Sequence, residues 1–599
     1  MPDPCEKYEI GFWLPDGRVT LPCPVQEIKP LYFKGNDSYP WSYFVNLHHY
    51  VSTFNTYNYC GAKLPLAHNG LNIKYWRENL ADYHDSELCD FLEFGWPLGI
   101  DPSVPLNSTL RNHPSSVQFP DFVDKFIKKQ IYSNALVGPC IVNPFQSGIC
   151  ISPLMTVPKK PDGRRIVLDA TFGDGPNAAT PKGEYLGDSY EFNFPKVDQF
   201  TEMIRNLGPG CLLWKRDLRN YFLQLMVNPS DYNKMCLVWR NVLFFFAGMM
   251  FGFRNSGLAG QRTTTAVVYI FKKNAEIAFN KQFGALNYSD DLAGAEKGLD
   301  AWQAFDFMSV VLKNLGLEES IEKALPPSTN MEYLGIEFDT IAMEKRVTPA
   351  KLTELDTALD EWLVKVKATK KELQSILHRL LWVVSCVNNS RVFVSRIISE
   401  LKRLDKNHHR VSLSDDIRKD FRWFKLFLNT FNGVQLIETN AWPDVDLLEN
   451  CGDACPEAGG AYVGDQYFSR VFPAFLKDEH IHIKEFHVVL VTVKFWGPRW
   501  TGKKVVIRCD NDAVCDTVFY QKPTDPKLQE CLRELLYWLC RYNCSVSVQK
   551  IGTKDNFVAD FLSRYTDEEE ISEFFGKNNI PKKTRVSISD SYFQFSGAW

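Results

Sequence analysis

The sequence predicts a multidomain protein that combines α+β and α/β domains, and three observations support this prediction. The chain has 599 residues, a length typical of about three to five domains. Carboxylates lie at the ends of predicted strands in two separate regions, 217–291 and 453–560. A basic segment with a helical pattern, 363–410, lies between these regions. We therefore expect two active-site regions with a helical region between them.

The composition indicates a folded protein whose positive charge is local. Hydrophobic residues make up 45% of the chain and aromatic residues 14%, and the formal net charge is −4. Binding to a nucleic acid would therefore depend on local basic surfaces. The longest apolar run, 241–253, is too short to cross a bilayer, and the first residues lack the pattern of a signal peptide. We expect an intracellular protein, in the cytoplasm or the nucleus, without a membrane partner.

Three aspartates form the first candidate site. Asp290 and Asp291 lie between two short apolar runs in ALNYSDDLAGAE, a pattern typical of a β-hairpin with the pair at its turn. The apolar stretch CLLW leads to Asp217, which is followed by Tyr221 and Phe222. Phosphoryl transfer to a hydroxyl uses two divalent cations held by carboxylates from separate strands. The three aspartates fit this need, with Mg²⁺ as the expected metal and Mn²⁺ as an alternative; a solvated turn is the simpler interpretation of the pair.

Together with MMFGFRNSGLAGQRTTTAVVYIF, residues 249–271, these motifs resemble the palm of reverse transcriptases. The family's motifs are an Asp followed by aromatic residues, a Phe-Gly loop that leads into a helix, and Tyr-x-Asp-Asp. The chain has Met250 where the family usually has Pro. The resemblance implies two catalytic metal ions at the three aspartates, and it places Phe222 beneath the incoming sugar. It assigns to the nucleotide site the residues Phe222, Phe251, Gly252, Gln261 and Tyr288.

Two further segments extend this resemblance. SPLMTVPKKPDGRRIVLDAT, residues 152–171, is similar to the fingers hairpin, in which Lys159 or Lys160 and Arg165 would bind the triphosphate. Lys323 matches a catalytic lysine near the pyrophosphate, where it would neutralise or protonate the leaving group. The alternative for these cations is an ordinary solvated surface.

A second set of carboxylates follows in the order Asp453, Glu485, Asp510 and Asp560. Apolar residues at helical spacing predict an amphipathic helix that begins near Glu485, and Asp510 follows the apolar strand VVIRC. The glycine pair in GDACPEAGGAYVG predicts a close backbone approach beside a strand. The order resembles ribonuclease H, which implies a second two-metal site that cuts the RNA strand of an RNA–DNA hybrid. The His that often precedes the last Asp in that family is absent here.

The segment between the two sites carries the strongest local charge. From 363 to 410, eleven Lys and Arg residues face three acidic residues, a net charge of +8. We expect Lys370, Lys371 and Arg379 to contact the phosphates of a duplex, with salt-dependent binding. The alternative is a solvated helical face. Leu334 and Gly335 lie in a segment that is similar to the hairpin that grips the primer.

The resemblance implies a right-hand polymerase followed by a ribonuclease H-like domain. The expected parts are an unassigned region 1–90, fingers and palm 91–345, a helical thumb and connection 346–436, a ribonuclease H domain 437–565, and a tail 566–599 whose charge pattern is typical of a solvated linker. The phrases FLEFGWPLGI and ELQSILHRLLWVVSCVNNSRVFVSRIISEL are similar to the polymerase and ribonuclease H region of DIRS-like retrotransposons, which integrate with a tyrosine recombinase.

The function that this resemblance implies is RNA-directed DNA synthesis with ribonuclease H activity and two metal ions at each site. Its partners would be an RNA template, a DNA primer, an RNA–DNA hybrid and dNTPs, together with a separate tyrosine recombinase and a structural protein of the element. One alternative is a domesticated or decayed retroelement protein that binds nucleic acid without synthesis. Another is the palm of an RNA-dependent RNA polymerase, against which the attached ribonuclease H motifs argue.

Overall fold

The structure is a computed structural model with mixed α and β architecture. It describes residues 12–13, 19–20 and 70–596, apart from 141–142, 146–147, 160–162, 193, 388–389, 405–408, 430, 432, 438–448 and 522–524. The chain divides into two compact units. Unit 1 comprises Met1–Lys196 and Leu212–Ser328, and unit 2 comprises Val197–Cys211 and Thr329–Trp599. Most of the region 1–90, which the sequence left unassigned, lies outside the described residues.

The central sheet of unit 1 has four strands in the order β11-β12-β8-β13. The strands are β8 (Leu212–Asp217), β11 (Gly284–Tyr288), β12 (Asp291–Glu296) and β13 (Leu325–Ser328). β11 and β12 form the hairpin predicted from the two apolar runs around Asp290 and Asp291, and β8 pairs antiparallel with β12. Gly294 lies where β12 meets the ring of Trp214, since a Cβ at this position would lie 2.4 Å from that ring. The sheet therefore has its hairpin turn and the end of β8 at one edge.

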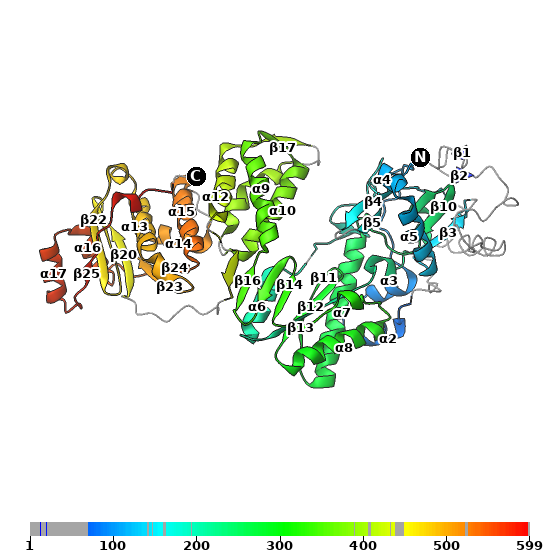
Figure 1. The fold of residues 1–599 in the computed structure, drawn as a ribbon, viewed down its shortest axis with the longest axis horizontal. Helices are drawn as coiled ribbons and strands as arrows, with labels where there is room; N and C mark the ends of the chain where they lie inside the picture. The colour runs from blue at the N-terminus through cyan, green and yellow to red at the C-terminus, as the bar shows by residue number, and fades with distance from the viewer. Residues whose placement is uncertain are drawn as a thin grey trace. The chain divides into compact units, whose positions relative to one another are not determined.

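Two helices pack together and against this sheet (Figure 1): α7 (Ser256–Phe279) and α8 (Leu299–Leu315). α7 is the helix that the Phe-Gly segment predicts. Its first half is buried almost all round, and it ends at Asn280, which adopts a left-handed conformation (φ 53°) suited to a helix C-terminus. α8 likewise ends at a left-handed glycine, Gly316.

The rest of unit 1 surrounds this core. A three-stranded sheet has the order β3-β10-β9, with β3 (Leu136–Cys140), β9 (Cys236–Trp239) and β10 (Val242–Phe246). β4 (Leu154–Lys159) and β5 (Gly163–Leu168) form the predicted antiparallel hairpin. The remaining elements are α2 (Ile73–Asn79), α3 (Leu88–Phe94), α4 (Pro114–Gln118), α5 (Pro120–Tyr132), β6 (Glu184–Tyr185) and β7 (Asp188–Ser189).

The first part of unit 2 joins a small sheet to a group of helices. The sheet has the order β14-β15-β16-β19, with β14 (Asn330–Tyr333), β15 (Ile336–Asp339), β16 (Glu344–Arg346) and β19 (Val434–Leu436). The helices confirm the helical pattern of the basic segment and its flanks: α9 (Pro349–Val364), α10 (Lys370–Cys386), α11 (Ser395–Lys402) and α12 (Asp415–Leu428). β17 (Lys367–Thr369) pairs with β18 (Arg410–Ser412), and α6 (Val197–Leu207) belongs to the same unit.

The second part of unit 2 is built on a six-stranded sheet in the order β24-β23-β20-β21-β22-β25. Its strands are β20 (Asn450–Ala454), β21 (Ala458–Val463), β22 (Gln466–Val471), β23 (Lys504–Cys509), β24 (Ser545–Lys550) and β25 (Thr584–Arg585). The helices are α13 (Ile481–Trp496), α14 (Asp512–Tyr520), α15 (Pro526–Tyr542), α16 (Phe557–Arg564) and α17 (Glu568–Lys577). β20 and β23 run parallel, so their carboxyl ends meet at the same edge.

Two glycines on β21 permit helices to approach both faces of this sheet. A Cβ on Gly459 would lie 2.6 Å from Val488 of α13, and a Cβ on Gly460 would lie 2.5 Å from the backbone of Leu562 in α16. Because neighbouring strand residues point to opposite faces, α13 and α16 cover opposite faces. This confirms the close approach predicted from the glycine pair. The prediction of an amphipathic helix after Glu485 is wrong in one respect, since α13 is buried on all sides from residue 483 to 494.

The tail beyond residue 565 is a folded part of unit 2, so the expectation of a solvated linker is wrong. Ile571 and Phe575 of α17 are buried, and Phe575 contacts Tyr467 edge-on at 5.5 Å. β25 pairs in parallel with β22 and adds the sixth strand. Near the end of the chain, Phe593 is buried. The acidic run that suggested a linker forms the first turn of α17, where carboxylates favour the helix dipole.

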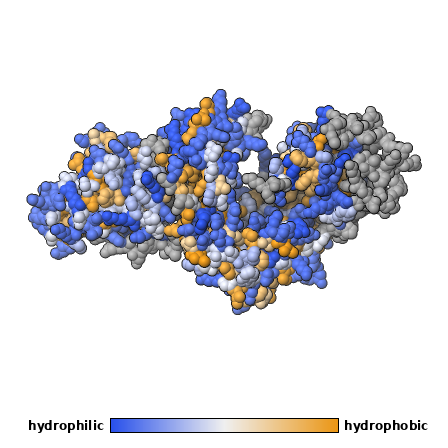
Figure 2. All heavy atoms as spheres, viewed as in Figure 1, coloured by the Kyte–Doolittle hydropathy of each residue, from blue (hydrophilic) through white to orange (hydrophobic). Residues whose placement is uncertain are grey.

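Hydrophilic residues cover most of the surface visible in Figure 2, and hydrophobic residues form small separate groups on it. Among the described residues, no helix combines the length and the apolar character needed to cross a membrane.

Candidate active sites

The three predicted aspartates of unit 1 come together at one edge of the central sheet. Asp217 is the last residue of β8, and Asp291 is the first residue of β12. These two residues are directly paired in the antiparallel register. Asp290 lies in the turn between β11 and β12. Two strands from distant parts of the sequence thus place three carboxylates at one point, as the sequence predicted.

The turn that carries Asp290 is fixed by its neighbours. Ser289 adopts a left-handed conformation (φ 54°), and its backbone N–H donates to Oε1 of Gln261 at 3.1 Å. The N–H of Leu218, just beyond β8, donates to the carbonyl of Asp290 at 3.1 Å. Gln261 lies on α7 and is buried. The predicted nucleotide-site residue Gln261 therefore supports the turn that carries Asp290, which we call the catalytic turn after its predicted role.

Two lysines contact these carboxylates directly. Lys323 Nζ lies 2.6 Å from Asp217 Oδ1, and Lys215 Nζ lies 2.8 Å from Asp291 Oδ1. The sequence predicted Lys323 but not Lys215. Lys215 could have been found from strand periodicity, because it lies two residues before Asp217 and therefore on the same face of β8.

Burial raises the pKa of both Asp290 and Asp291, and the neighbouring Asp217 adds to this effect in each case. Buried carboxylates at such close quarters ionise readily only when cations balance them. The oxygen donors of these three side chains suit hard divalent cations such as Mg²⁺. The residues present therefore fit a metal site, in which Lys215 and Lys323 already provide part of the positive charge.

Aromatic residues of the predicted nucleotide site adjoin the carboxylates. The ring of Phe222 lies 4.9 Å from that of Phe251 and covers Gly260 of α7, where a Cβ would come within 2.7 Å of it. The guanidinium of Arg165, on β5, lies 4.8 Å from the centre of the Phe251 ring. Its positive charge also acts to lower the pKa of Asp290. Arg165, Phe251 and Phe222 therefore lie in a continuous group beside the catalytic turn.

The other residues assigned to the nucleotide site are placed as follows. Gly252 has a φ of 104°, and a Cβ there would lie 2.1 Å from the carbonyl oxygen of Leu168, so the loop requires glycine. Lys159 is exposed at the end of β4, and Lys160 lies outside the described residues. Tyr288, the last residue of β11, is exposed at the hairpin turn.

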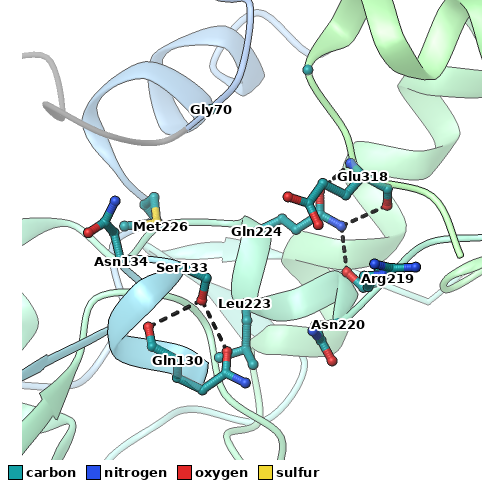
Figure 3. Close-up of a pocket in the computed structure, with 11 residues that line it drawn as sticks. Gly70, Gln130, Ser133, Asn134, Arg219, Asn220, Leu223, Gln224, Met226 and Glu318 are labelled. Atoms are coloured by element: carbon teal, nitrogen blue, oxygen red, sulfur yellow. Dashed lines mark hydrogen bonds between the residues drawn. The ribbon is translucent and has the colours of Figure 1, made fainter. Parts of the chain in front are cut away.

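A cavity of about 360 Å³ lies beyond the end of β8 in the same unit. It is lined by Arg219, Asn220 and Gln224, among others (Figure 3). Gln224 bridges the backbone there, since its Nε2 donates to the carbonyls of Arg219 at 2.6 Å and Glu318 at 3.0 Å. The described residues that line this cavity include none of the predicted site residues. The cavity is therefore separate from the group of carboxylates.

The second set of carboxylates also converges, in unit 2. Asp453 lies on β20, and Asp510 directly follows β23, the parallel neighbour of β20. Glu485 lies on α13 and Asp560 on α16, the two helices that cover opposite faces of the sheet. Both Asp510 and Asp560 act on the pKa of Asp453, and both Asp453 and Asp510 act on that of Glu485. The four predicted residues thus form one electrostatic cluster.

Burial and the mutual repulsion of the carboxylates oppose ionisation of this cluster. Burial, together with Asp510 and Asp560, raises the pKa of Asp453 to about 7, although Ser563 Oγ donates a 2.7 Å hydrogen bond to it. Burial and the neighbouring carboxylates raise the pKa of Glu485 to about 9. A divalent cation would relieve this repulsion, and the oxygen donors fit Mg²⁺.

Two further side chains of this cluster were not predicted from the sequence. Ser563 is buried on α16 and orients Asp453, and no spacing signal in the sequence pointed to it. Cys509 Sγ lies 3.8 Å from Glu485 Oε2, and possible ligand atoms of Glu485, Cys509 and Asp510 lie within 4.8 Å of one another. Cys509 is the last residue of β23 and directly precedes Asp510. Its thiol, a possible metal ligand next to a predicted ligand, is the signal in the sequence that pointed to it.

The predicted nucleic-acid residues of unit 2 differ in their freedom to contact a partner. Leu334 and Gly335 form the turn between β14 and β15, with φ values of 50° and 81°. Lys370 Nζ donates to the carbonyl of Leu404, and Arg379 is paired with Glu354 at 3.2 Å. Lys371, in the first turn of α10, is exposed. A duplex would meet Lys371 more readily than the two cations with protein partners.

The chain is similar to solved structures, whereas its sequence matches no family model or curated protein. A structure of the foamy viral protease-reverse transcriptase in complex with dsDNA shares 15% sequence identity, covers 82% of this chain and 98% of that chain, and has a TM-score of 0.41. A structure of the same foamy viral protein with an RNA/DNA hybrid shares 15% identity, covers 80% of this chain and 63% of that chain, and has a TM-score of 0.41. The identities and TM-scores describe a similarity of structure. The functional argument is therefore built on the two carboxylate clusters of this chain.

Proposed function

We propose that the protein is an RNA-directed DNA polymerase with ribonuclease H activity, which copies RNA into DNA and degrades the RNA strand of the hybrid. The observation that carries the proposal is the convergence of Asp217, Asp290 and Asp291 where β8 and β12 are paired. A second carboxylate cluster in the same chain, around Asp453 and Glu485, supports the second activity.

At the polymerase site the aspartates would hold two Mg²⁺ ions, which supply charge neutralisation for the attacking hydroxyl and the leaving pyrophosphate. The role of this chain is to orient that set. The paired strands fix Asp217 and Asp291, and Gln261 fixes the turn that carries Asp290. Lys323 lies at the carboxylate of Asp217, close enough to neutralise or protonate a leaving group.

Nucleotide selection would depend on the group beside the turn. Arg165 provides a positive charge for a triphosphate, and the Phe222 ring provides a wall for the sugar. Phe222 is itself held by Phe251 and by its position over Gly260. A rigid wall of this kind rejects a larger sugar by steric clash.

At the ribonuclease H site Asp453, Glu485, Asp510 and Asp560 would hold the cations, which would offset the burial and repulsion that raise the pKa values of Asp453 and Glu485. Ser563 holds the carboxylate of Asp453, and Arg564 pairs with Asp560 at 2.7 Å. We further propose that an RNA template, a DNA primer and dNTPs are the substrates. We propose a DIRS-like retrotransposon as the source of the chain, with a separate tyrosine recombinase and structural protein as partners.

The test is primer extension on an RNA template whose 5′ end is labelled, with dNTPs and Mg²⁺. The proposal expects DNA synthesis together with shortening of the labelled RNA, and loss of both when EDTA removes divalent cations. Extension with rNTPs in preference to dNTPs would contradict it and favour an RNA polymerase. Tight binding of the template and primer with neither reaction would favour a decayed protein.

A further inference from the structure

Four aromatic rings form a connected row on unit 1, which we call the aromatic row: Tyr190, Phe192, Phe194 and Tyr288. The first three alternate along the segment that follows β7. Tyr190 and Phe192 meet edge-on at 5.2 Å, and Phe192 and Phe194 lie parallel at 5.3 Å with an interplanar angle of 9°. Phe194 lies 4.9 Å from Tyr288. The row therefore leads from the surface to the hairpin that carries the catalytic turn.

The aromatic row is not an ordinary part of the hydrophobic core. The side chain of Phe192 is 43% exposed and that of Tyr288 is 39% exposed, whereas Tyr190 and Phe194 are partly buried. By contrast, Phe244, Phe245 and Phe246 of β10 are completely buried in the same unit. Rings that are stacked on one another and still open to solvent present flat faces to a partner.

The position of the row limits what that partner can be. Tyr288 is followed by Ser289 and Asp290 of the catalytic turn. At the other side, the Phe192 ring lies over Gly257 at the start of α7, where a Cβ would be 3.8 Å from it. The row is thus continuous with the proposed polymerase site. A strand bound at that site would therefore have the rings of the row within reach.

The charges around the row are mixed and do not form a basic surface for phosphates. The exposed acidic residues Glu184, Asp188 and Glu191 lie in the same segment as the exposed Lys182 and Lys196, and Arg254 acts on the pKa of Tyr190. Aromatic rings bind bases by stacking, which does not require a positive surface. The bases of a duplex are stacked on one another, so unpaired bases are the ones that offer free faces.

We propose that Tyr190, Phe192, Phe194 and Tyr288 form a stacking surface for unpaired bases of the template strand next to the catalytic turn. This inference rests on the proposed polymerase function, because the primer end is paired at the site of synthesis and the uncopied template is not. Phe192, the most exposed phenylalanine of the row, would make the main contact.

The test measures binding to three DNA–RNA primer–template duplexes, without Mg²⁺ or dNTPs, by fluorescence anisotropy. One has an unpaired 5′ template overhang, one has the same overhang with abasic sites, and one is blunt. Phe192→Ala should weaken binding to the first by about fivefold or more, the lower range for one base–aromatic stack. It should leave the abasic and blunt duplexes unchanged. Phe192→Trp should retain binding, because it retains a ring.

The matched control is Phe279→Ala at the other end of α7, since Phe279 is 38% exposed and also contacts other rings. This change should leave all three affinities as in the wild type. An equal loss on all three duplexes for Phe192→Ala, or no loss on the overhang, would overturn the inference and leave the row to a protein partner. Primer extension by the wild type is scored separately, so failure of the polymerase proposal is distinguishable from failure of the stacking surface.

Discussion

Phe222 is the residue whose contacts most directly suggest control of substrate choice. Its ring lies between Phe251 and Gly260, beside the carboxylates, and is only partly buried. Phe222→Val should keep dNTP incorporation within roughly tenfold and raise ribonucleotide incorporation, because the steric clash with a 2′-hydroxyl is relieved. Competition between dNTP and rNTP in single-nucleotide extension measures this. Unchanged discrimination in the variant would mean that Phe222 is a packing residue only.

Glu485 predicts a pH effect on stability when no metal is bound. Its pKa is raised to about 9 in the folded protein, so its contribution to stability is present at low pH and is lost as pH rises towards 9. Glu485→Gln cannot ionise and should lose less stability over this range. Between pH 5 and pH 9 in EDTA, the fall in Tm should be smaller in the variant by at least about 2 °C.

The control for this experiment is Glu479→Gln. Glu479 lies in the same unit as Glu485 and pairs with Lys527 at 2.7 Å. It should leave the pH dependence of Tm close to that of the wild type. Added Mg²⁺ should restore the Tm of the wild type at pH 9 more than that of Glu485→Gln. Parallel pH profiles for the wild type and Glu485→Gln would show that the buried carboxyl does not oppose folding.

Asp217, Asp291 and Asp510 were predictable because they appear in the sequence as aspartates at the ends of apolar strands. Asp217 and Asp291 are the clearest example, since strand pairing brings them opposite one another. Ser563 could not be assigned in the same way, whereas the period of two along β8 places Lys215 on the face of Asp217. Serine is a common surface residue, and only the folded backbone brings Ser563 to Asp453.

At the scale of elements, the C-terminal tail should stabilise unit 2. Phe593 is buried and contacts Phe472, which in turn lies against Gly459 of β21. Phe593→Ala should lower the free energy of unfolding by about 3–5 kcal/mol, because it leaves a cavity. Urea unfolding measures this. Phe519→Ala, at a side chain that is 75% exposed, is the control and should change stability little.

If Phe593→Ala lowered the free energy of unfolding by less than about 1 kcal/mol, the tail would not be a stabilising part of unit 2. The expectation of a linker rested on two charged clusters of the tail, at 567–570 and 582–585, and not on its apolar residues. Ile571 and Phe575 have the i, i+4 spacing of a buried helix face, and the residues that they cover, such as Tyr467, come from a distant part of the chain.

The helix α10 carries the predicted contacts to a duplex. Changing Lys370, Lys371 and Arg379 together to Gln should weaken binding to hybrid and duplex alike and reduce the dependence of log affinity on log salt. Since Lys370 and Arg379 have protein partners, Lys371→Gln alone should account for most of the change. Affinity measured over a salt series tests this. Lys577→Gln, an exposed lysine on α17, is the control.

A salt dependence in the α10 variants equal to that of the wild type would place the duplex elsewhere.

Helix α13 shows a different limit of sequence reasoning at this scale. The spacing of apolar residues after Glu485 predicted the helix correctly but suggested one exposed face. That face is covered by α15 and the tail, which come from later parts of the chain.

At the scale of the molecule, the sequence predicted many of the helices and strands but not how they are divided between the two compact units. The hairpins, the long helix after the Phe-Gly loop and the strand and helix order around the second site are all present. The boundary expected near residue 345 differs from the compact units, since residues 329–345 and helix α6 belong to unit 2. Such grouping depends on long-range packing, which local patterns do not encode.

The proposed function requires two separate active sites, and two substitutions test this separation when synthesis and hybrid cleavage are measured side by side. Asp290→Asn should abolish DNA synthesis on an RNA template while cleavage of a preformed RNA–DNA hybrid continues. Asp453→Asn should abolish hybrid cleavage while synthesis continues. If either single change eliminated both activities in a protein with an unaltered Tm, the two-site account would be contradicted.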